Sequence, residues 1–210
     1  MGFFRKIENE NGLIGIWKLT ETPAELLGEV RLSAEELRRY ENMKVERRQT
    51  EYLATRLLLT KILGNDATIV YNGIGKPFLK NQFKNISISH SINFVTVFIS
   101  DQKIGIDVEL ATRSTDRVTS RFLHPDEEKY ISGLQNQQLA KIVYWSAKEA
   151  IFKSTEEQGI QFNKQIIINN FNPDFGSHFS AQLLFSEKIL KYQLTYVPVE
   201  NNVMVYCVQE

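Results

Sequence analysis

The sequence predicts an α+β protein made of two similar lobes, each with helices packed on a small, mostly antiparallel sheet. Each half of the chain opens with an apolar strand, continues with helical periodicity and closes with short strands separated by turn residues. The 210 residues suffice for two such lobes, each within the usual range of domain sizes. The shared order suggests a duplication. We expect an N-terminal lobe over 1–102 and a C-terminal lobe over 103–210.

The first lobe is expected to begin with a strand over 13–19, which is mostly apolar. Ser33 and Glu36 have the spacing of a capping box, which predicts that a helix begins at position 34. A longer helix is expected from about 44 to 63, because apolar residues recur there at helical spacing and Gly64 follows. The strand candidates after it are 67–71, 85–89 and 93–100.

The second lobe is expected to open with a strand over 103–110, where apolar residues alternate with others. Helical stretches follow between about 115 and 156. One of them should start at His124, because proline and the acidic residues 126–128 suit a first helical turn better than a metal site. The closing strand candidates are 165–169, 179–185, 192–197 and 203–208.

Composition and charge limit the classes of partner. Basic and acidic side chains number 25 each, so the net charge is zero and no global field attracts a polyanion; nucleic acid is not an expected partner. Cys207 is the single cysteine and excludes an intrachain disulfide framework. The charged start lacks the apolar core of a signal peptide, and no apolar run is long enough to cross a bilayer. We expect a cytoplasmic protein without a membrane partner.

Two acidic residues lie on the strand expected over 103–110. Side chains alternate between the two faces of a strand, so Asp107 and Glu109 should point the same way. About forty residues later, the segment 145–153 (Trp-Ser-Ala-Lys-Glu-Ala-Ile-Phe-Lys) is expected to be helical, which places Glu149 and Lys153 on one side. The residues of this segment expected in the core are Trp145, Ile151 and Phe152.

Three carboxylates and a lysine can therefore converge. Carboxylate oxygens suit Mg²⁺, which prefers one or two carboxylates, several waters and a substrate phosphate to a closed protein cage. The pattern points to phosphate chemistry. Each motif alone has a common structural explanation, since most Asp-x-Glu pairs and helical Lys-Glu pairs decorate the surface. Only the combination indicates a site.

The segment 73–78 (Gly-Ile-Gly-Lys-Pro-Phe) adds phosphate-binding character. Gly75 permits close approach of the backbone, Lys76 can act as a mobile point charge, and Pro77 restricts the turn that follows. The spacing of a Walker loop is absent, so a P-loop nucleotide triphosphatase is not supported.

A second polar segment, 86–91 (Ile-Ser-Ile-Ser-His-Ser), places Ser89 and His90 at the end of a strand. A phosphate beside His90 would favour the charged form of its ring. Taken alone, this histidine is more readily explained by an ordinary structural hydrogen bond than by a ligand contact.

Four ordered segments, 75–77, 87–91, 105–109 and 145–153, resemble the signature blocks of the 4′-phosphopantetheinyl transferases, in particular the Sfp-type branch that activates carrier proteins. The segments occur in that family's order and approximate spacing. The two-lobed outline extends the similarity over most of the chain, and the part beyond 160 matches only in general character.

The resemblance implies transfer of the 4′-phosphopantetheine arm from coenzyme A to a serine of an apo acyl or peptidyl carrier protein, with release of adenosine 3′,5′-bisphosphate. By the family's pattern Asp107, Glu109 and Glu149 bind Mg²⁺, while Lys153 and Lys148 neutralise charge on the pyrophosphate. Glu149 is also a candidate general base. The residues leave open whether Glu149 itself or a metal-bound water takes the proton.

The same resemblance assigns the nucleotide end of coenzyme A to the first lobe and the metal to the second. His90 resembles the histidine that contacts the 3′-phosphate, and Arg48 and Arg56 lie where the family often places basic residues for it. Helical periodicity does not decide which of these two arginines and Arg47 meets the phosphate. The residues expected beside the nucleotide are Gly75, Lys76, Pro77 and Ser89.

Two other functions use the same features. A metal-dependent phosphohydrolase of a nucleotide-type substrate would use the carboxylates to activate water, and a non-catalytic module would bind a carrier protein and retain only the fold. A monomer is expected, since two lobes in one chain would complete the site. The carrier and its pathway are left open.

Overall fold

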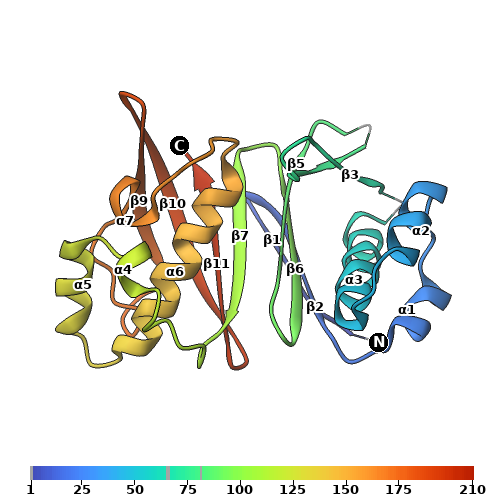
Figure 1. Ribbon diagram of the computed structural model, residues 1–210, viewed down its shortest axis with the longest axis horizontal. Helices are drawn as coiled ribbons and strands as arrows, with labels where there is room; N and C mark the ends of the chain where they lie inside the picture. The colour runs from blue at the N-terminus through green and yellow to red at the C-terminus, as the bar shows by residue number, and fades with distance from the viewer. Residues whose placement is uncertain (1, 65–66, 81) are drawn as a thin grey trace. The chain divides into compact units, whose positions relative to one another are not determined.

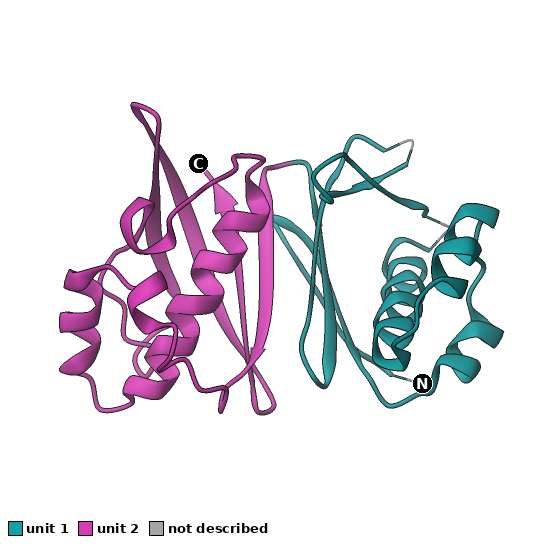
Figure 2. Cartoon of the chain, in the orientation of Figure 1, with its two compact units in different colours: residues 1–101 teal, residues 102–210 magenta. Residues whose placement is uncertain are grey.

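A computed structural model describes residues 2–64, 67–80 and 82–210. The chain divides into two compact units, residues 1–101 and residues 102–210 (Figure 2). Each unit combines helices with an antiparallel sheet (Figure 1), so the predicted α+β class is confirmed.

The N-terminal unit contains a four-stranded antiparallel sheet in the order β1-β2-β6-β5. Its strands are β1 (Phe3–Asn9), β2 (Gly12–Lys18), β5 (Asn85–His90) and β6 (Phe94–Ser100). The sequence pattern predicted the last three. It did not predict β1, whose side chains are mostly exposed and show no apolar alternation.

Helix α3 (Glu46–Leu63) packs on β2 and β6 and builds the core of this unit. Helix α1 (Pro23–Glu29) also contacts α3, so α3 is buried on nearly every side between Glu51 and Leu59. Gly64 ends the helix in the left-handed region at φ +73°, as its place after the apolar pattern predicted. The predicted start at about 44 is two residues early.

Capping boxes begin the two short helices before α3. In α2 (Ala34–Glu41) the Ser33 hydroxyl accepts from the Glu36 N–H, and the Glu36 carboxylate accepts from the Ser33 N–H, as the sequence predicted. Thr22 and Glu25 form the same arrangement at the start of α1.

A short hairpin joins α3 to the main sheet of the unit. It consists of β3 (Ile69–Tyr71) and β4 (Pro77–Leu79), which pair antiparallel. The turn between them depends on Gly75, whose φ of +83° favours glycine. β4 was not predicted, because the segment 73–78 was interpreted only as a phosphate-binding loop.

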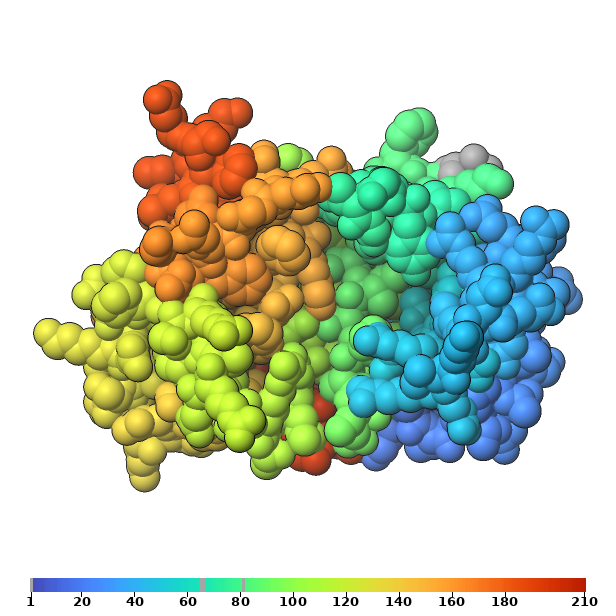
Figure 3. All heavy atoms as spheres, in the orientation of Figure 1, coloured from blue at the N-terminus to red at the C-terminus, as the bar shows by residue number. Residues whose placement is uncertain are grey.

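The C-terminal unit contains a five-stranded antiparallel sheet in the order β7-β11-β10-β9-β8. Its strands are β7 (Ile104–Leu110), β8 (Ile166–Ile168), β9 (His178–Phe185), β10 (Lys188–Val199) and β11 (Asn202–Gln209). All five were predicted, although β10 is longer than expected. The tip of the β9–β10 hairpin projects from its unit (Figure 3).

Helix α6 (Gln137–Ser154) lies across β7 and β11 and supplies much of the core of the C-terminal unit. Helix α5 (Pro125–Ser132) begins at His124 as predicted, with the Glu127 carboxylate accepting from the His124 N–H. The remaining short helices are α4 (Thr119–Phe122) and α7 (Phe162–Gln165).

The two units share part of their connectivity. In the N-terminal unit, β2 precedes the helices and pairs with the last strand, β6, which also pairs with β5. In the C-terminal unit, β7 precedes the helices and pairs with the last strand, β11, which also pairs with β10. A duplication of one lobe into the other stays a prediction. Among the residues described, no helix has both the length and the apolar character needed to cross a membrane.

Candidate functional site

The contact between β7 and α6 brings the predicted acidic motifs together. Gly105 faces α6 at its closest approach: a Cβ at this position would lie 1.8 Å from the carbonyl oxygen of Ala150 and 3.1 Å from the backbone nitrogen of Ser154. Only glycine therefore allows the helix backbone this close to the strand. The acidic residues two and four positions along β7 then lie beside those of α6.

Replacement of Gly105 by Ala is expected to destabilise the protein by about 2–3 kcal/mol, because backbone atoms of α6 cannot move aside as a flexible side chain can. Urea unfolding measures the loss. Gly28→Ala is the matched control, since a Cβ on Gly28 would meet nothing within 4 Å. Equal stabilities for both variants would contradict the role given to Gly105.

Asp107, Glu109, Glu149 and Lys153 form one electrostatically coupled group. Lys153 Nζ donates to Asp107 Oδ1 at 2.7 Å and to the Ile106 carbonyl at 3.2 Å. Asp107 is buried, whereas Glu109 and Glu149 are partly exposed. The helical and strand spacing seen in the sequence thus places these four side chains as predicted.

Two further side chains contact Glu109. Trp145 Nε1 donates to Glu109 Oε1 at 3.1 Å, and the Arg113 guanidinium pairs with the same oxygen and lies 5.5 Å from the centre of the Trp145 ring. Trp145 was expected in the core; it is only partly buried, and its N–H holds a carboxylate.

Burial and mutual repulsion change the acidity of this group. Burial is the largest cause that raises the pKa of Glu149 to about 7, followed by the charge of Asp107, while Lys153 opposes both. Burial also raises the pKa of Glu109. The charge of Asp107 raises it further, and the charge of Arg113 lowers it. Perturbed carboxylates gathered at one place are typical of functional sites.

The donor set suits Mg²⁺, because carboxylate oxygens are hard ligands and this ion usually keeps several waters and substrate phosphates. Within 2–64, 67–80 and 82–210, no group of three or more His, Cys, Asp and Glu side chains is arranged to hold a metal by itself. Cations of the chain contact two of the carboxylates here, Lys153 at Asp107 and Arg113 at Glu109. A metal held here would therefore need ligands from water or a substrate phosphate beside these carboxylates.

Lys148 lies apart from this group. Its ammonium is fully buried and donates to Glu127 Oε2 at 2.6 Å, the Ile166 carbonyl at 2.6 Å and the Phe162 carbonyl at 3.1 Å. These three acceptors use all three of its N–H groups. The expectation that Lys148 neutralises substrate charge does not fit this position, and the geometry favours a structural role.

A cavity of about 540 Å³ adjoins Glu149 in the C-terminal unit. Phe122, Trp145 and Phe162 supply aromatic surface to it, and Arg121 contributes a positive charge. An elongated, partly apolar group bound here would lie next to the carboxylates.

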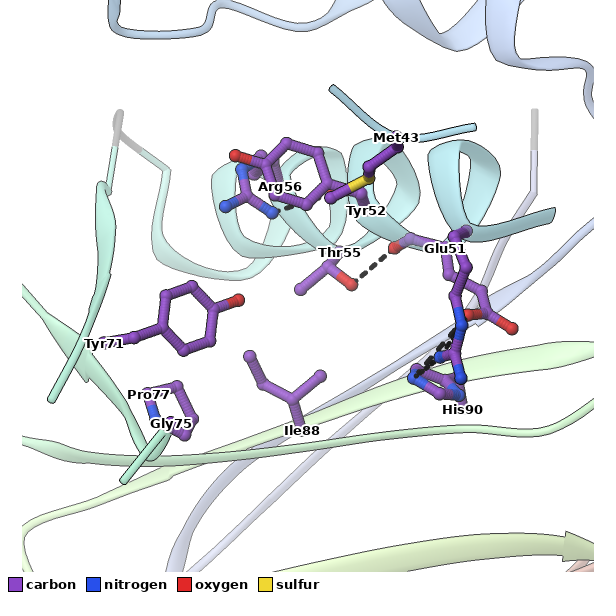
Figure 4. A pocket seen from close by; sticks show the side chains of 11 residues that line it. Met43, Glu51, Tyr52, Thr55, Arg56, Tyr71, Gly75, Pro77, Ile88 and His90 are labelled. Atoms are coloured by element: carbon purple, nitrogen blue, oxygen red, sulfur yellow. Dashed lines mark hydrogen bonds and ion pairs between the residues drawn. The ribbon is translucent and has the colours of Figure 1, made fainter. Parts of the chain in front are cut away.

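The N-terminal unit has a cavity of about 330 Å³ between α3 on one side and β5 with the β3–β4 hairpin on the other (Figure 4). It gathers five of the seven residues expected at the nucleotide end. Those five are Arg48, Arg56, Gly75, Pro77 and His90, and the other residues that line it are Met43, Glu51, Tyr52, Thr55, Tyr71 and Ile88.

Arg48 and Arg56 differ in the exposure of their side chains and in the contacts that hold them. The Arg48 side chain is 61% exposed and contacts His90, with Nη1 and Nε2 3.0 Å apart. Arg56 is 4% exposed; its Nε donates to Glu36 Oε1 at 3.0 Å and its Nη1 to the Tyr52 carbonyl at 3.0 Å. Within the described residues Arg56 Nη2 is buried and has no hydrogen-bond partner.

The turn at Gly75 and the residues Lys76 and Ser89 complete the set expected at the nucleotide end. The backbone N–H groups of Ile74 and Lys76 donate to the Asn72 side chain, and that of Gly75 donates to the Asn72 carbonyl, so these groups stabilise the turn. Lys76 and Ser89 are not among the residues that line the cavity.

Several contacts were missed from the sequence. Glu36 and Glu51 each hold an arginine at the cavity, and Glu127 holds Lys148. A signal existed for Glu51, which follows Arg47 and Arg48 at helical spacing. None existed for the other two, whose partners are 20 and 21 residues away.

Comparison with known proteins identifies a family match in the C-terminal unit. Residues 103–207, half of the 210-residue chain, match the model of the 4′-phosphopantetheinyl transferase superfamily. A relative named 4′-phosphopantetheinyl transferase gsp, from Aneurinibacillus migulanus, is 32% identical over 85 residues, which is 40% of this chain and 35% of that protein. The aligned part thus spans about a third of that relative's length.

Proposed function

Because the chain belongs to the 4′-phosphopantetheinyl transferase superfamily, we propose that it transfers the 4′-phosphopantetheine arm of coenzyme A to a serine of an apo acyl or peptidyl carrier protein. Adenosine 3′,5′-bisphosphate is the second product. One observation carries the proposal: the coupled carboxylates of β7 and α6, with Lys153 among them, lie inside the region that matches the family.

The reaction joins the serine Oγ to the phosphorus nearer the pantetheine arm and breaks the bond from that phosphorus to the bridging oxygen. That oxygen leaves with adenosine 3′,5′-bisphosphate and takes the bonding electrons. Asp107, Glu109 and Glu149 would hold Mg²⁺, which when bound offsets the negative charge of the pyrophosphate.

Side chains of the C-terminal unit supply the remaining chemistry. Glu149, which borders the cavity of this unit, accepts the serine proton directly or through a water. The Lys153 ammonium, oriented by Asp107 and the Ile106 carbonyl, stabilises charge on the phosphate oxygens. The cavity beside Glu149 has apolar walls suited to the pantetheine arm.

At the nucleotide end, the cavity of the N-terminal unit offers Arg48, Arg56 and His90 to the 3′-phosphate. Tyr71 and Ile88 provide apolar surface for the adenine. We further propose that the protein is a monomer that acts in the cytoplasm. Its single cysteine, Cys207, is buried as a free thiol, which is compatible with a reducing compartment.

The proposal is tested by incubating the protein with coenzyme A, Mg²⁺ and a panel of apo carrier proteins. We expect the mass of at least one carrier to increase by that of the phosphopantetheinyl group, and the increase to disappear when the carrier serine is replaced by Ala. Consumption of coenzyme A without any carrier would instead indicate a phosphohydrolase. Absence of both reactions would favour a module that only binds.

A further inference from the structure

Glu51 is the acidic residue among those that line the cavity of the N-terminal unit. Its side chain is 4% exposed, and both carboxylate oxygens contact arginines of its own helix. Arg47 Nε donates to Oε1 at 2.9 Å, and Arg48 Nη1 donates to Oε2 at 3.0 Å. A buried carboxylate is costly unless such donors compensate it.

The Glu51 carboxylate also lies near His90 of β5. His90 Nε2 is 3.6 Å from Glu51 Oε2 and 3.0 Å from Arg48 Nη1. A guanidinium only donates hydrogen bonds, so the ring nitrogen is the acceptor in the contact with Arg48. Figure 4 shows Glu51 and His90 at one end of the cavity, with Arg56 and Tyr71 farther along it.

An acidic group beside an expected anion site requires a physical reason, since its charge repels a phosphate. Arg47 and Arg48 are adjacent in sequence and largely exposed, with side-chain exposures of 52% and 61%. Without a fixed acceptor the two like charges would separate into solvent, and ordering a free arginine on a ligand loses side-chain entropy. Glu51 is fixed by burial and therefore restrains both.

We propose that Glu51 is a positioning residue that holds Arg48, and through it His90, ready for the 3′-phosphate of coenzyme A. This inference rests on the proposed function. It selects Arg48 over Arg47 as the phosphate ligand, because Arg48 lines the cavity and contacts His90 whereas Arg47 does not line it. The selectivity of the protein for coenzyme A over 3′-dephospho-coenzyme A then depends on Glu51.

The test is isothermal titration calorimetry of the full chain with coenzyme A and with 3′-dephospho-coenzyme A, both in the presence of Mg²⁺. The wild type should bind coenzyme A more tightly. In Glu51→Gln the Kd for coenzyme A should rise about tenfold, the loss expected for a weakened charge-assisted hydrogen bond. The Kd for the dephospho compound should stay unchanged, so the preference disappears.

Glu46→Gln is the matched control. It makes the same change of charge on the same helix, at an exposed position without a place in the cavity, and should preserve the preference. Arg48→Gln keeps Glu51 and removes the proposed ligand, so it should abolish the preference as Glu51→Gln does. If Glu51→Gln fails to fold, Arg48→Gln still measures whether the preference for coenzyme A depends on the arginine that Glu51 contacts.

The outcomes separate the two proposals. Binding of coenzyme A with unchanged preference in Glu51→Gln would overturn the role of Glu51 and leave the proposed function standing. An equal rise in both Kd values would show that Glu51 only supports the fold, which also overturns it. A wild type that binds neither compound would overturn the proposed function as well.

Discussion

Replacement of Glu149 by Gln is expected to lower the rate of phosphopantetheine transfer about a thousandfold or more. The substitution keeps the shape of the side chain but removes a ligand charge and the candidate proton acceptor at the reacting center, and losses of this size accompany such changes. The measurement is the initial rate of carrier modification, followed by mass spectrometry. Retained transfer with an unchanged dependence on Mg²⁺ would remove Glu149 from the site.

The same variant is expected to be more stable than the wild type at pH 8 when Mg²⁺ is absent. The ordinary pKa of 4.5 applies to the unfolded chain, and the folded protein raises the pKa of Glu149 to about 7. Below pH 4.5 the carboxyl is protonated in both states and contributes no difference. As the pH rises from 4.5 through 7 the unfolded state ionises first, so the wild type loses stability relative to the variant.

The advantage of Glu149→Gln should therefore appear between pH 4.5 and 7 and level off above pH 7. The full shift corresponds to about 3 kcal/mol, and partial exposure of Glu149 reduces the expected gain to about 1–2 kcal/mol. Urea unfolding at several pH values in a chelator measures it. Glu157→Gln, at an exposed position, is the control and should show no such rise.

Replacement of Lys148 by Met is expected to destabilise the protein by about 3–5 kcal/mol, the usual effect of removing one partner of a buried ion pair. Glu127 would remain buried without its cation, and two carbonyl groups would lose their donor. The buried lysine joins α6 to α5, α7 and β8, so the loss affects the support of the helix that carries Glu149. Urea unfolding followed by circular dichroism measures this loss.

A second substitution distinguishes the ion pair from other causes. Lys148→Met combined with Glu127→Gln removes both charges, and we expect it to recover more than about 1 kcal/mol through the coupling of the two sites. Lys141→Met on the same helix removes a cation 3.4 Å from Asp116 at the surface and should cost at most about 1 kcal/mol. A Lys148→Met protein of normal stability that lacks transfer activity would restore the catalytic role first expected for Lys148.

Regular local patterns made much of the fold predictable. Alternating apolar residues predicted β7, a continuous apolar run predicted β11, helical spacing followed by Gly64 predicted α3, and the Ser33–Glu36 spacing predicted the start of α2. Strand β1 was not predicted because its largely exposed side chains show no apolar alternation. Strand β4 was not predicted because the segment 73–78 was interpreted only as a phosphate-binding loop.

Side-chain roles on α6 show where prediction from the sequence stops. Ile151, expected in the core, is fully buried, but Phe152 is 40% exposed and Trp145 contacts a carboxylate. Helical spacing reports which residues share a side of the helix. It does not show which other segments of the chain cover that side.

The sequence by itself determined that the chain has α+β elements, and it predicted that three carboxylates and a lysine carry its chemistry. Their spacing on a strand and on a helix requires only local geometry. Only the tertiary structure decided that Gly105 allows α6 to approach β7, that the Lys148 ammonium is buried among three acceptors, and that Glu51 contacts Arg47 and Arg48, of which Arg48 lines the cavity. The free energy of a charged side chain depends on its burial and its partners, and those partners come from distant parts of the chain.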